Sequence, residues 1–198
     1  MSKIRRLDSV GTRRNSAGTE VANFCDKEQF VRMFVYIDDG ETGATLLKGS
    51  LVSLEYRNSG DCHVLVNGVA TLAREHFGFG NVCKLSDTGD DVMKLFACGV
   101  LAESITLAAG GFAIVDVQVA GLFENALLKD AGVEGHRLFA SNVPGESENE
   151  ASADFDSSGP CIGVQLEAAV QDTGKVFSSD DSLFFGDIYL LDPFNLAE

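Results

Sequence analysis

The chain has 198 residues, of which 45% are hydrophobic and 23% charged, a composition that can bury a core and excludes a disordered protein. Its 30 acidic and 15 basic residues give a net charge of −15, which disfavours binding of nucleic acid or of an anionic membrane by the bulk of the surface. No apolar run approaches the roughly 20 residues of a membrane span, and the opening residues lack the apolar segment of a secretory signal. We therefore expect no membrane partner, no direct nucleic-acid partner and synthesis in a cytoplasm.

The first residues carry a charge opposite to that of the rest of the chain. Residues 1–14 hold five basic side chains against one acidic residue, a local charge of +4, so the remaining residues carry −19. These basic residues are Lys3, Arg5, Arg6, Arg13 and Arg14. Because large apolar residues are scarce here, we predict that residues 1–22 form an extended basic arm on a single β-rich domain of residues 23–198. Such an arm suits docking onto an acidic neighbour, including another copy of the chain, and the alternative is a frayed, solvated tail.

Short apolar runs separated by turn residues predict strands rather than long helices, since the chain holds 21 glycines and only 3 prolines. The predicted strands are, in chain order, 30–37, 44–56 (one or two strands around Lys48-Gly49), 62–73, 92–102, 112–119, 161–169 and 183–191. Within 62–73, Asn67-Gly68 between apolar residues predicts a hairpin turn. Gly186 in the last strand predicts a β-bulge.

Two of the predicted strands alternate between apolar and polar residues, which is typical of a strand with one buried face. The expected core residues are Ala113, Val115, Val117 and Val119 in the first, and Ile162, Val164 and Leu166 in the second. Residues 122–131 fit either a short helix or a continuation of the preceding strand. Together these patterns predict an all-β fold.

Residues 142–160 are small, polar and acidic, and no basic residue occurs between Arg137 and Lys175. They predict a long exposed acidic loop between two strands. Within it, residues 154–159 begin like a calcium-binding loop, with Asp154 and Asp156 followed by Ser158 and a glycine. Gln165 stands where such a loop has its bidentate glutamate, so we expect an acidic turn and leave calcium binding as the alternative.

Residues with catalytic or metal-binding potential are scattered along the chain. His63, His76 and His136 show none of the spacings of a metal site, and adjacent acidic pairs such as Asp38-Asp39 lie in turns, where they keep a surface solvated. We therefore predict no enzyme, no cofactor and no metal. The chain holds five cysteines with no CxxC pair, which we expect to be free thiols: Cys25, Cys62, Cys83, Cys98 and Cys161.

One part of the chain resembles a known family. Residues 109–121 (AGGFAIVDVQVAG) are followed by 125–128 (NALL), then by 135–141 (GHRLFAS) and, after a gap, by 159–168 (GPCIGVQLEA). This order of strands and turns, which covers about a third of the chain, resembles the capsid decoration (cement) proteins of tailed phages. The resemblance implies a β-barrel or β-tulip body, symmetric self-association into a homo-oligomer, and a place on the capsid surface of a virion.

That resemblance also implies the main partner, because cement proteins lie over the seams between subunits of the major capsid protein. The basic arm would then be the partner-binding segment. Three alternatives stay open from the sequence: another virion component such as a head fibre or tail protein, a β-barrel hydrolase or processing domain with His136 or His63 as a base, and a barrel that binds a small ligand.

Overall fold

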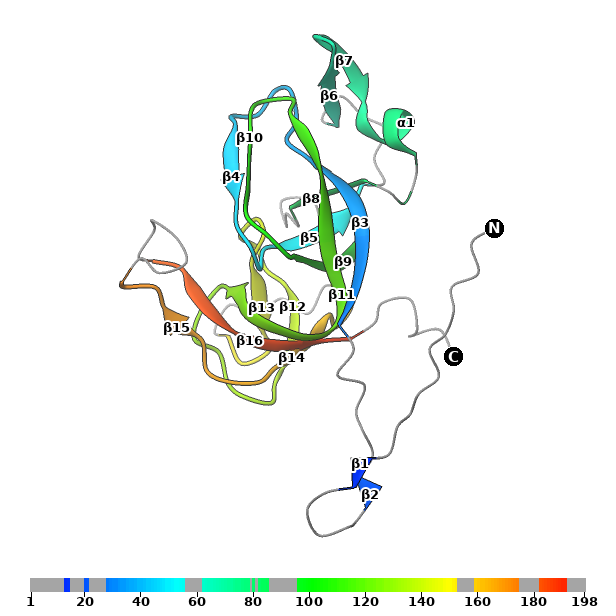
Figure 1. Ribbon diagram of the computed structural model, residues 1–198. Helices are drawn as coiled ribbons and strands as arrows, with labels where there is room; N and C mark the ends of the chain where they lie inside the picture. The colour runs from blue at the N-terminus through cyan, green and yellow to red at the C-terminus, as the bar shows by residue number, and fades with distance from the viewer. Residues whose placement is uncertain are drawn as a thin grey trace.

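The computed structural model describes residues 28–55, 62–78, 80, 82–85, 96–152, 159–174 and 182–191, together with the backbone of two short strands near the N-terminus. Within this part of the chain the structure is all-β apart from one helix of five residues, so the predicted fold class is confirmed (Figure 1). Ten of the strands belong to one continuous sheet. That sheet turns back on itself twice.

The sheet first closes on itself through a ring of five paired strands. Strand β11 pairs with β3, β3 with β8, β8 with β5, β5 with β9, and β9 again with β11. Within this ring only the β3–β8 pairing is parallel. The members are β3 (Gln29–Tyr36), β5 (Leu51–Leu54), β8 (Val82–Leu85), β9 (Ala97–Leu101) and the first part of β11 (Phe112–Leu128).

The second ring uses the other end of β11. Here β11 pairs with β13, β13 with β12, β12 with β14, β14 with β16, and β16 with β11. A short strand, β15 (Val170–Gln171), extends the sheet from β16. The other members are β12 (Arg137–Ala140), β13 (Ser147–Asn149), β14 (Gly163–Gln165) and β16 (Phe184–Leu190).

The 17-residue strand β11 therefore belongs to both rings, and Figure 1 shows it running from the upper half of the molecule into the lower half. Residues 122–128, for which a helix or a longer strand had fitted equally well, continue the strand. A bulge interrupts its pairing with β16 between Phe123 and Ala126. At the bulge Asn125 has a positive φ of 62°, and its N–H donates to Asp187 Oδ1 at 3.0 Å. The sequence had predicted a bulge at Gly186 on β16. The bulge lies instead on the facing segment of β11.

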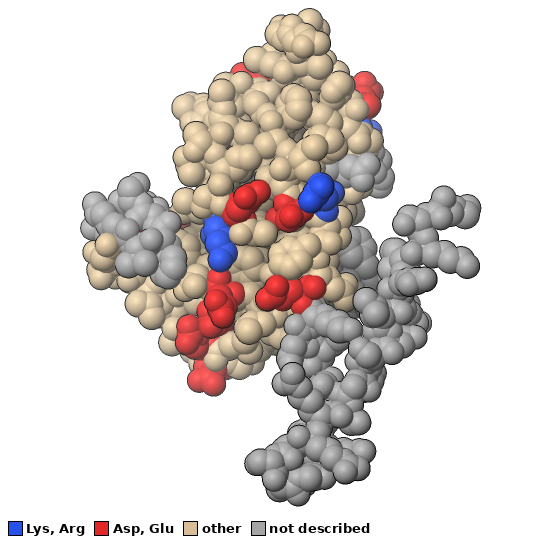
Figure 2. All heavy atoms as spheres, in the orientation of Figure 1, with Lys and Arg blue, Asp and Glu red and all other residues tan. Residues whose placement is uncertain are grey.

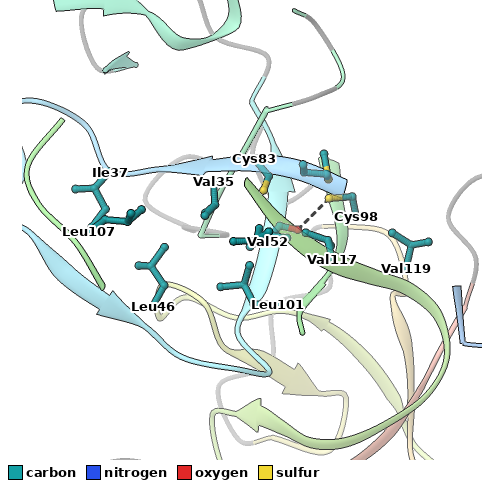
Figure 3. Close-up of a cluster of buried hydrophobic side chains, with 12 residues drawn as sticks. Val35, Ile37, Leu46, Val52, Cys83, Cys98, Leu101, Leu107, Val117 and Val119 are labelled. Atoms are coloured by element: carbon teal, nitrogen blue, oxygen red, sulfur yellow. Dashed lines mark hydrogen bonds between the residues drawn. The ribbon is translucent and has the colours of Figure 1, made fainter. Parts of the chain in front are cut away.

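The two larger clusters of buried apolar side chains are built on the strands of the rings. In the first ring Val115, Val117 and Val119 are buried and Ala113 packs against this cluster, which confirms the inward face predicted for this strand. Figure 3 shows Val117 and Val119 among the other buried side chains. They meet Met33 and other residues contributed by the surrounding strands. The second cluster includes Phe123, Leu138, Ile188 and Leu190 from strands of the second ring, and also Leu51, Ala97 and Val100 from β5 and β9 of the first ring. A third, smaller cluster contains Tyr36, Cys62, Val64, Ala73 and Val82, and Phe34 and Phe77 pack against it.

Two smaller units sit outside the rings. Strands β4 (Ala44–Leu46) and β10 (Ile105–Leu107) pair with each other, and β6 (His63–Val66) and β7 (Val69–Leu72) form a hairpin that leads into α1 (Ala73–Phe77). The hairpin turn is the predicted one, because Asn67 and Gly68 both have positive φ, as a type I′ turn requires. Helix α1 was not predicted; it begins at Ala73, the last residue of the segment 62–73 that was expected to be strand.

The predictions for residues 142–169 need two corrections. Residues 147–149 of the expected exposed loop form the buried strand β13, and Glu148 there pairs with Lys129 Nζ at 2.8 Å. The inward face of 161–169 is also different, because Gln165 is fully buried while Leu166 is exposed. A hydrogen-bonding amide thus takes the inward position that the pattern gave to apolar residues. The calcium-like segment lies mostly outside the described residues.

Candidate interaction surface

The predicted partner-binding arm is described only in part. Lys3, Arg5 and Arg6 lie outside the described residues. Arg13 and Arg14 form strand β1 (Arg13–Arg14), which pairs antiparallel with β2 (Glu20–Val21). The arm therefore contains a short strand pair where a fully extended segment was expected.

The outer face of the β3–β11 pair carries large apolar side chains in register. Opposite each other across the two strands lie Phe34 and Ile114, and next to them Arg32 and Asp116. These residues alternate with the inward-facing ones, so they point away from the first core. Ile114 is 56% exposed, the highest exposure of any large apolar residue on β11. Phe30, at the start of β3, and Phe112, at the start of β11, are exposed as well.

An aromatic cluster borders this face at the end near α1. The rings of Phe34 and Phe77 stack with their centroids 4.2 Å apart, and Phe77 lies 4.7 Å from Phe112. His76 meets Phe77 edge-on at 4.7 Å. Offset and tilted ring contacts of this kind add to the stability that burial alone provides. We call Phe30, Phe34, Phe77, Phe112 and Ile114 the aromatic face.

The hairpin that supplies Phe77 is fixed firmly to the first ring. Asp38, just after β3, accepts hydrogen bonds from the backbone N–H of His63 at 2.9 Å and of Gly40 at 3.0 Å. The N–H of Leu65 donates to Gly110 O at 2.8 Å, on the turn that precedes β11. Asp38 is buried, so it fastens two elements together where the sequence had suggested a solvating turn residue. The aromatic face is therefore a preformed surface.

The charges on this face are few and balanced. The Arg32 guanidinium Nε lies 3.1 Å from Asp116 Oδ1, and both side chains are largely exposed. In the view of Figure 2, Asp and Glu side chains gather over the lower half of the body, where the second ring lies, while the upper half carries few charges. On a chain with a net charge of −15, an apolar face with one neutral ion pair is unusual. Contiguous exposed apolar patches commonly mark interaction sites.

A small cavity of about 230 Å³ lies at the end of the first ring. Its lining is mainly apolar, with Tyr36, Leu46, Leu85 and Pro144 among the residues, and with Lys84 as its cation. Lys84 Nζ pairs with Glu41 and lies 5.9 Å from the centre of the Tyr36 ring. The Tyr36 hydroxyl donates to Glu55 Oε2 at 2.6 Å. Tyr36, Glu41 and Lys84 of this cavity thus already have polar partners within the protein.

The candidate catalytic and metal-binding residues lie in different places. His63 is on β6, His76 on α1 and His136 just before β12, and no cluster of three or more potential metal ligands occurs in the described parts of the chain. His136 Nδ1 is 3.8 Å from Glu150 Oε1. Glu150 also accepts from the backbone N–H of Arg137 and pairs with its guanidinium, which together lower the pKa of the Glu150 carboxyl below its ordinary value.

Four of the five cysteines can be described, and all four are free thiols, as predicted for them. Cys25 lies outside the described residues. Burial raises the pKa of the Cys98 thiol from 9.0 to about 12, and burial together with the nearby Cys98 raises that of Cys83. Cys98 Sγ donates to Val52 O at 3.5 Å (Figure 3). Such thiols are held protonated and are poor nucleophiles.

Sequence reasoning missed the aromatic face, although part of the signal was present. Ile114 and Asp116 alternate with the inward valines of 112–119, so an apolar residue at an outward position could have been recognised. What the sequence could not reveal is that β3 lies beside β11, about 80 residues away, and adds Phe34 and Arg32 to the same face. Comparison with protein-family models, with curated proteins and with solved structures found no match. The one helix in the described part of the chain is too short to cross a membrane.

Proposed function

We propose that this chain is a structural protein of a tailed-phage virion that decorates the capsid and stabilises it by bridging subunits of the major capsid protein. The proposal starts from the resemblance of residues 109–168 to capsid decoration proteins. In the structure these residues form β11 and three strands of the second ring, so the resembling segment makes up the framework of the body.

The observation that carries the proposal is the aromatic face. It places large apolar side chains on the outside of two long paired strands, with a ring of paired strands behind them. A protein that stabilises an assembly acts by binding the assembled state more tightly than its parts, and this requires a rigid body with more than one contact region. The aromatic face and the predicted basic arm provide two such regions.

The test is to add the full-length protein to empty tailed-phage shells and to whole virions. We expect it to sediment with shells, to add surface density in negative-stain micrographs and to raise the temperature at which the shells break. Ile114→Glu should lower the amount bound, whereas Val170→Glu, at a 70% exposed position on β15, should bind as the unmodified protein does. Shells that stay bare and no more heat-resistant at saturating protein would contradict the proposal. Labelling of tails or fibres instead of shells would favour the other virion roles.

A further inference from the structure

The aromatic face has an arrangement of groups that can match itself. Across β3 and β11 the residue pairs are Phe34 with Ile114 and Arg32 with Asp116, so each row joins a residue on one strand to a chemically complementary residue on the other. In a symmetric dimer the same patch lies on both sides of the interface, and residue i of one copy meets residue j of the other. A patch whose rows are complementary pairs satisfies this condition.

The charge of the chain narrows the places where two copies can approach. With a net charge of −15 the copies repel each other over most of their surface. Arg32 and Asp116 neutralise each other within the face; the row on one side joins Phe34 to Ile114, and the row on the other joins Phe30 to the buried, uncharged Gln118. The aromatic face is therefore a region where a second copy meets little repulsion and gains apolar burial.

We propose that the aromatic face is the interface of a symmetric dimer of this chain. The two-fold axis runs along the strands, between β3 and β11, and the two sheets stack face to face. Arg32 of each copy then lies over Asp116 of the other. Ile114 of each copy lies over the Phe34–Phe77 ring pair of the other, so the residue with the greatest exposure on β11 becomes buried in an aromatic environment.

The ion pair indicates that the partner on this face is a second copy of the chain. Each Arg32–Asp116 pair can exchange its partner for the same group on the second copy, so dimer formation leaves neither charge unpaired. A stable interface buries about 800 Å² on each partner, of which the apolar anchors form the centre and polar residues the rim. The exposed side chains of Phe30, Phe112 and Ile114, with the half-buried rings of Phe34 and Phe77 beside them, supply such a centre. This inference rests on the proposed function and assigns the aromatic face to the contact between copies, so that the surfaces facing the shell, the basic arms among them, lie elsewhere on the dimer. The lower shell binding expected of Ile114→Glu then follows from loss of the dimer, which would give that function the two-sided body that bridging needs.

The first test measures the mass of the full-length protein by analytical ultracentrifugation over a range of concentrations, without shells. We expect a dimer that dissociates on dilution. Ile114→Glu should raise the dissociation constant at least about 100-fold, because two buried isoleucines per dimer are replaced by charges. Val170→Glu, the matched apolar-to-acidic change on β15, should leave the constant unchanged. A monomer at all concentrations, or equal effects of the two substitutions, would overturn the proposal.

The second test uses charge reversal. Arg32→Asp alone and Asp116→Arg alone should each weaken self-association at least about tenfold, because each places like charges over one another twice in the dimer. An equal mixture of the two variants should associate as strongly as the unmodified protein, since every crossed contact is again a pair of opposite charges. Circular dichroism establishes that both variants are folded. Two folded variants that stay monomeric when mixed would overturn the proposed axis and with it the interface.

These measurements separate the dimer from the proposed function. A protein that dimerises through this face but leaves shells bare would support the dimer and contradict the proposed function. A monomer that coats shells would support the proposed function and contradict the dimer.

Discussion

The buried amide of Gln165 determines which face of strand β14 points inward. Its Nε2 donates to Ala131 O and to Glu167 O, both at 2.7 Å, and its Oε1 accepts from Asn149 Nδ2 at 2.8 Å. The buried amide therefore has partners for both its donor and its acceptor groups. It links β14 to β13 and to the segment after β11, which no apolar residue at this position could do.

Replacing Gln165 by leucine should destabilise the protein by about 2 kcal/mol, because buried polar groups lose their partners. The free energy of unfolding in urea measures this effect. Leu166→Gln, at the exposed neighbouring position, should change it by less than about 0.5 kcal/mol. An unchanged stability for Gln165→Leu would show that the amide network is dispensable.

The buried thiols of the first core predict a dependence of stability on alkaline pH. The pKa of Cys98 is raised to about 12, so the folded state keeps the thiol proton at pH values where the unfolded chain loses it. The contribution of the Cys98 thiol to the free energy of unfolding is thus complete below pH 9 and is lost as the pH rises from 9 toward 12. Cys98→Ala should make the fall in unfolding free energy above pH 9 shallower by about 1.4 kcal/mol per pH unit.

The control for this experiment is Val35→Ala, which shortens another fully buried side chain of the same core without removing a titratable group. It should lower stability at neutral pH and retain the steep alkaline slope. If both variants show the same slope, the thiol proton does not contribute to the pH dependence.

At the scale of elements, the bulge in β11 is the point where the shared strand passes from one ring to the other. Asn125 takes the left-handed conformation there, and the loop at Gly49 packs directly against it: a Cβ at Gly49 would lie 2.6 Å from Asn125 O. Gly49 O also accepts from the N–H of Leu127 at 3.0 Å. The bulge thus joins the two rings through both backbone conformation and contact.

Asn125→Gly should leave the melting temperature within a few degrees of the original, whereas Asn125→Val should lower stability by about 1–2 kcal/mol. The reason is that a β-branched residue is strained at a positive φ, while asparagine and glycine adopt it easily. Thermal unfolding followed by circular dichroism compares the two variants. Equal melting temperatures would mean that the left-handed conformation at residue 125 adds no constraint.

Most strands could be predicted from the sequence, and their arrangement could not. Local alternation and turn residues located the strand at 112–119 and the turn at Asn67-Gly68, because both signals act over neighbouring residues. The inward position of Gln165 depends on Asn149 and on backbone carbonyls far away in sequence, which no local pattern contains. The same holds for β13, whose burial is set by the strands on either side of it.

The candidate surface, too, could be predicted from the sequence only in part. The sequence drew attention to the arm, because charge can be counted along the chain, and passed over the aromatic face, which exists only once β3 lies against β11. Arg32 belongs to a predicted strand, yet its partner Asp116 follows from the register of two distant segments. Surfaces assembled from paired strands are therefore found from structure, and charged segments from sequence.

At the scale of the whole molecule, the opposite charges of the arm and the body lead to a prediction about binding. Deleting residues 1–20 should leave the melting temperature of the body nearly unchanged, since this segment has few large apolar residues to add to either core. Binding to shells should fall sharply, and binding by the full chain should weaken as salt rises, because each exposed ion pair contributes only about 0.2–1 kcal/mol and is screened. Sedimentation with shells at low and high salt measures both effects.

A charge-neutralised arm provides the matched control for the deletion. Replacing Lys3, Arg5, Arg6, Arg13 and Arg14 by glutamine keeps the length of the chain and should reproduce the loss of binding. A truncated protein that coats shells as well as the full chain at both salt concentrations would show that the arm is a solvated tail.

The strand that serves both rings also determines the order in which the protein can fold during synthesis. The partners of the first half of β11 are β3 and β9, which leave the ribosome before it, so the first ring can close as soon as β11 emerges. The second half must wait for β16, which comes after the other strands of the second ring in the sequence. Until then the nascent chain has an unpaired strand edge next to a finished ring. A chain cut short before β16 would therefore hold a closed first ring beside an incomplete second one, and its open strand edge would make it prone to aggregate.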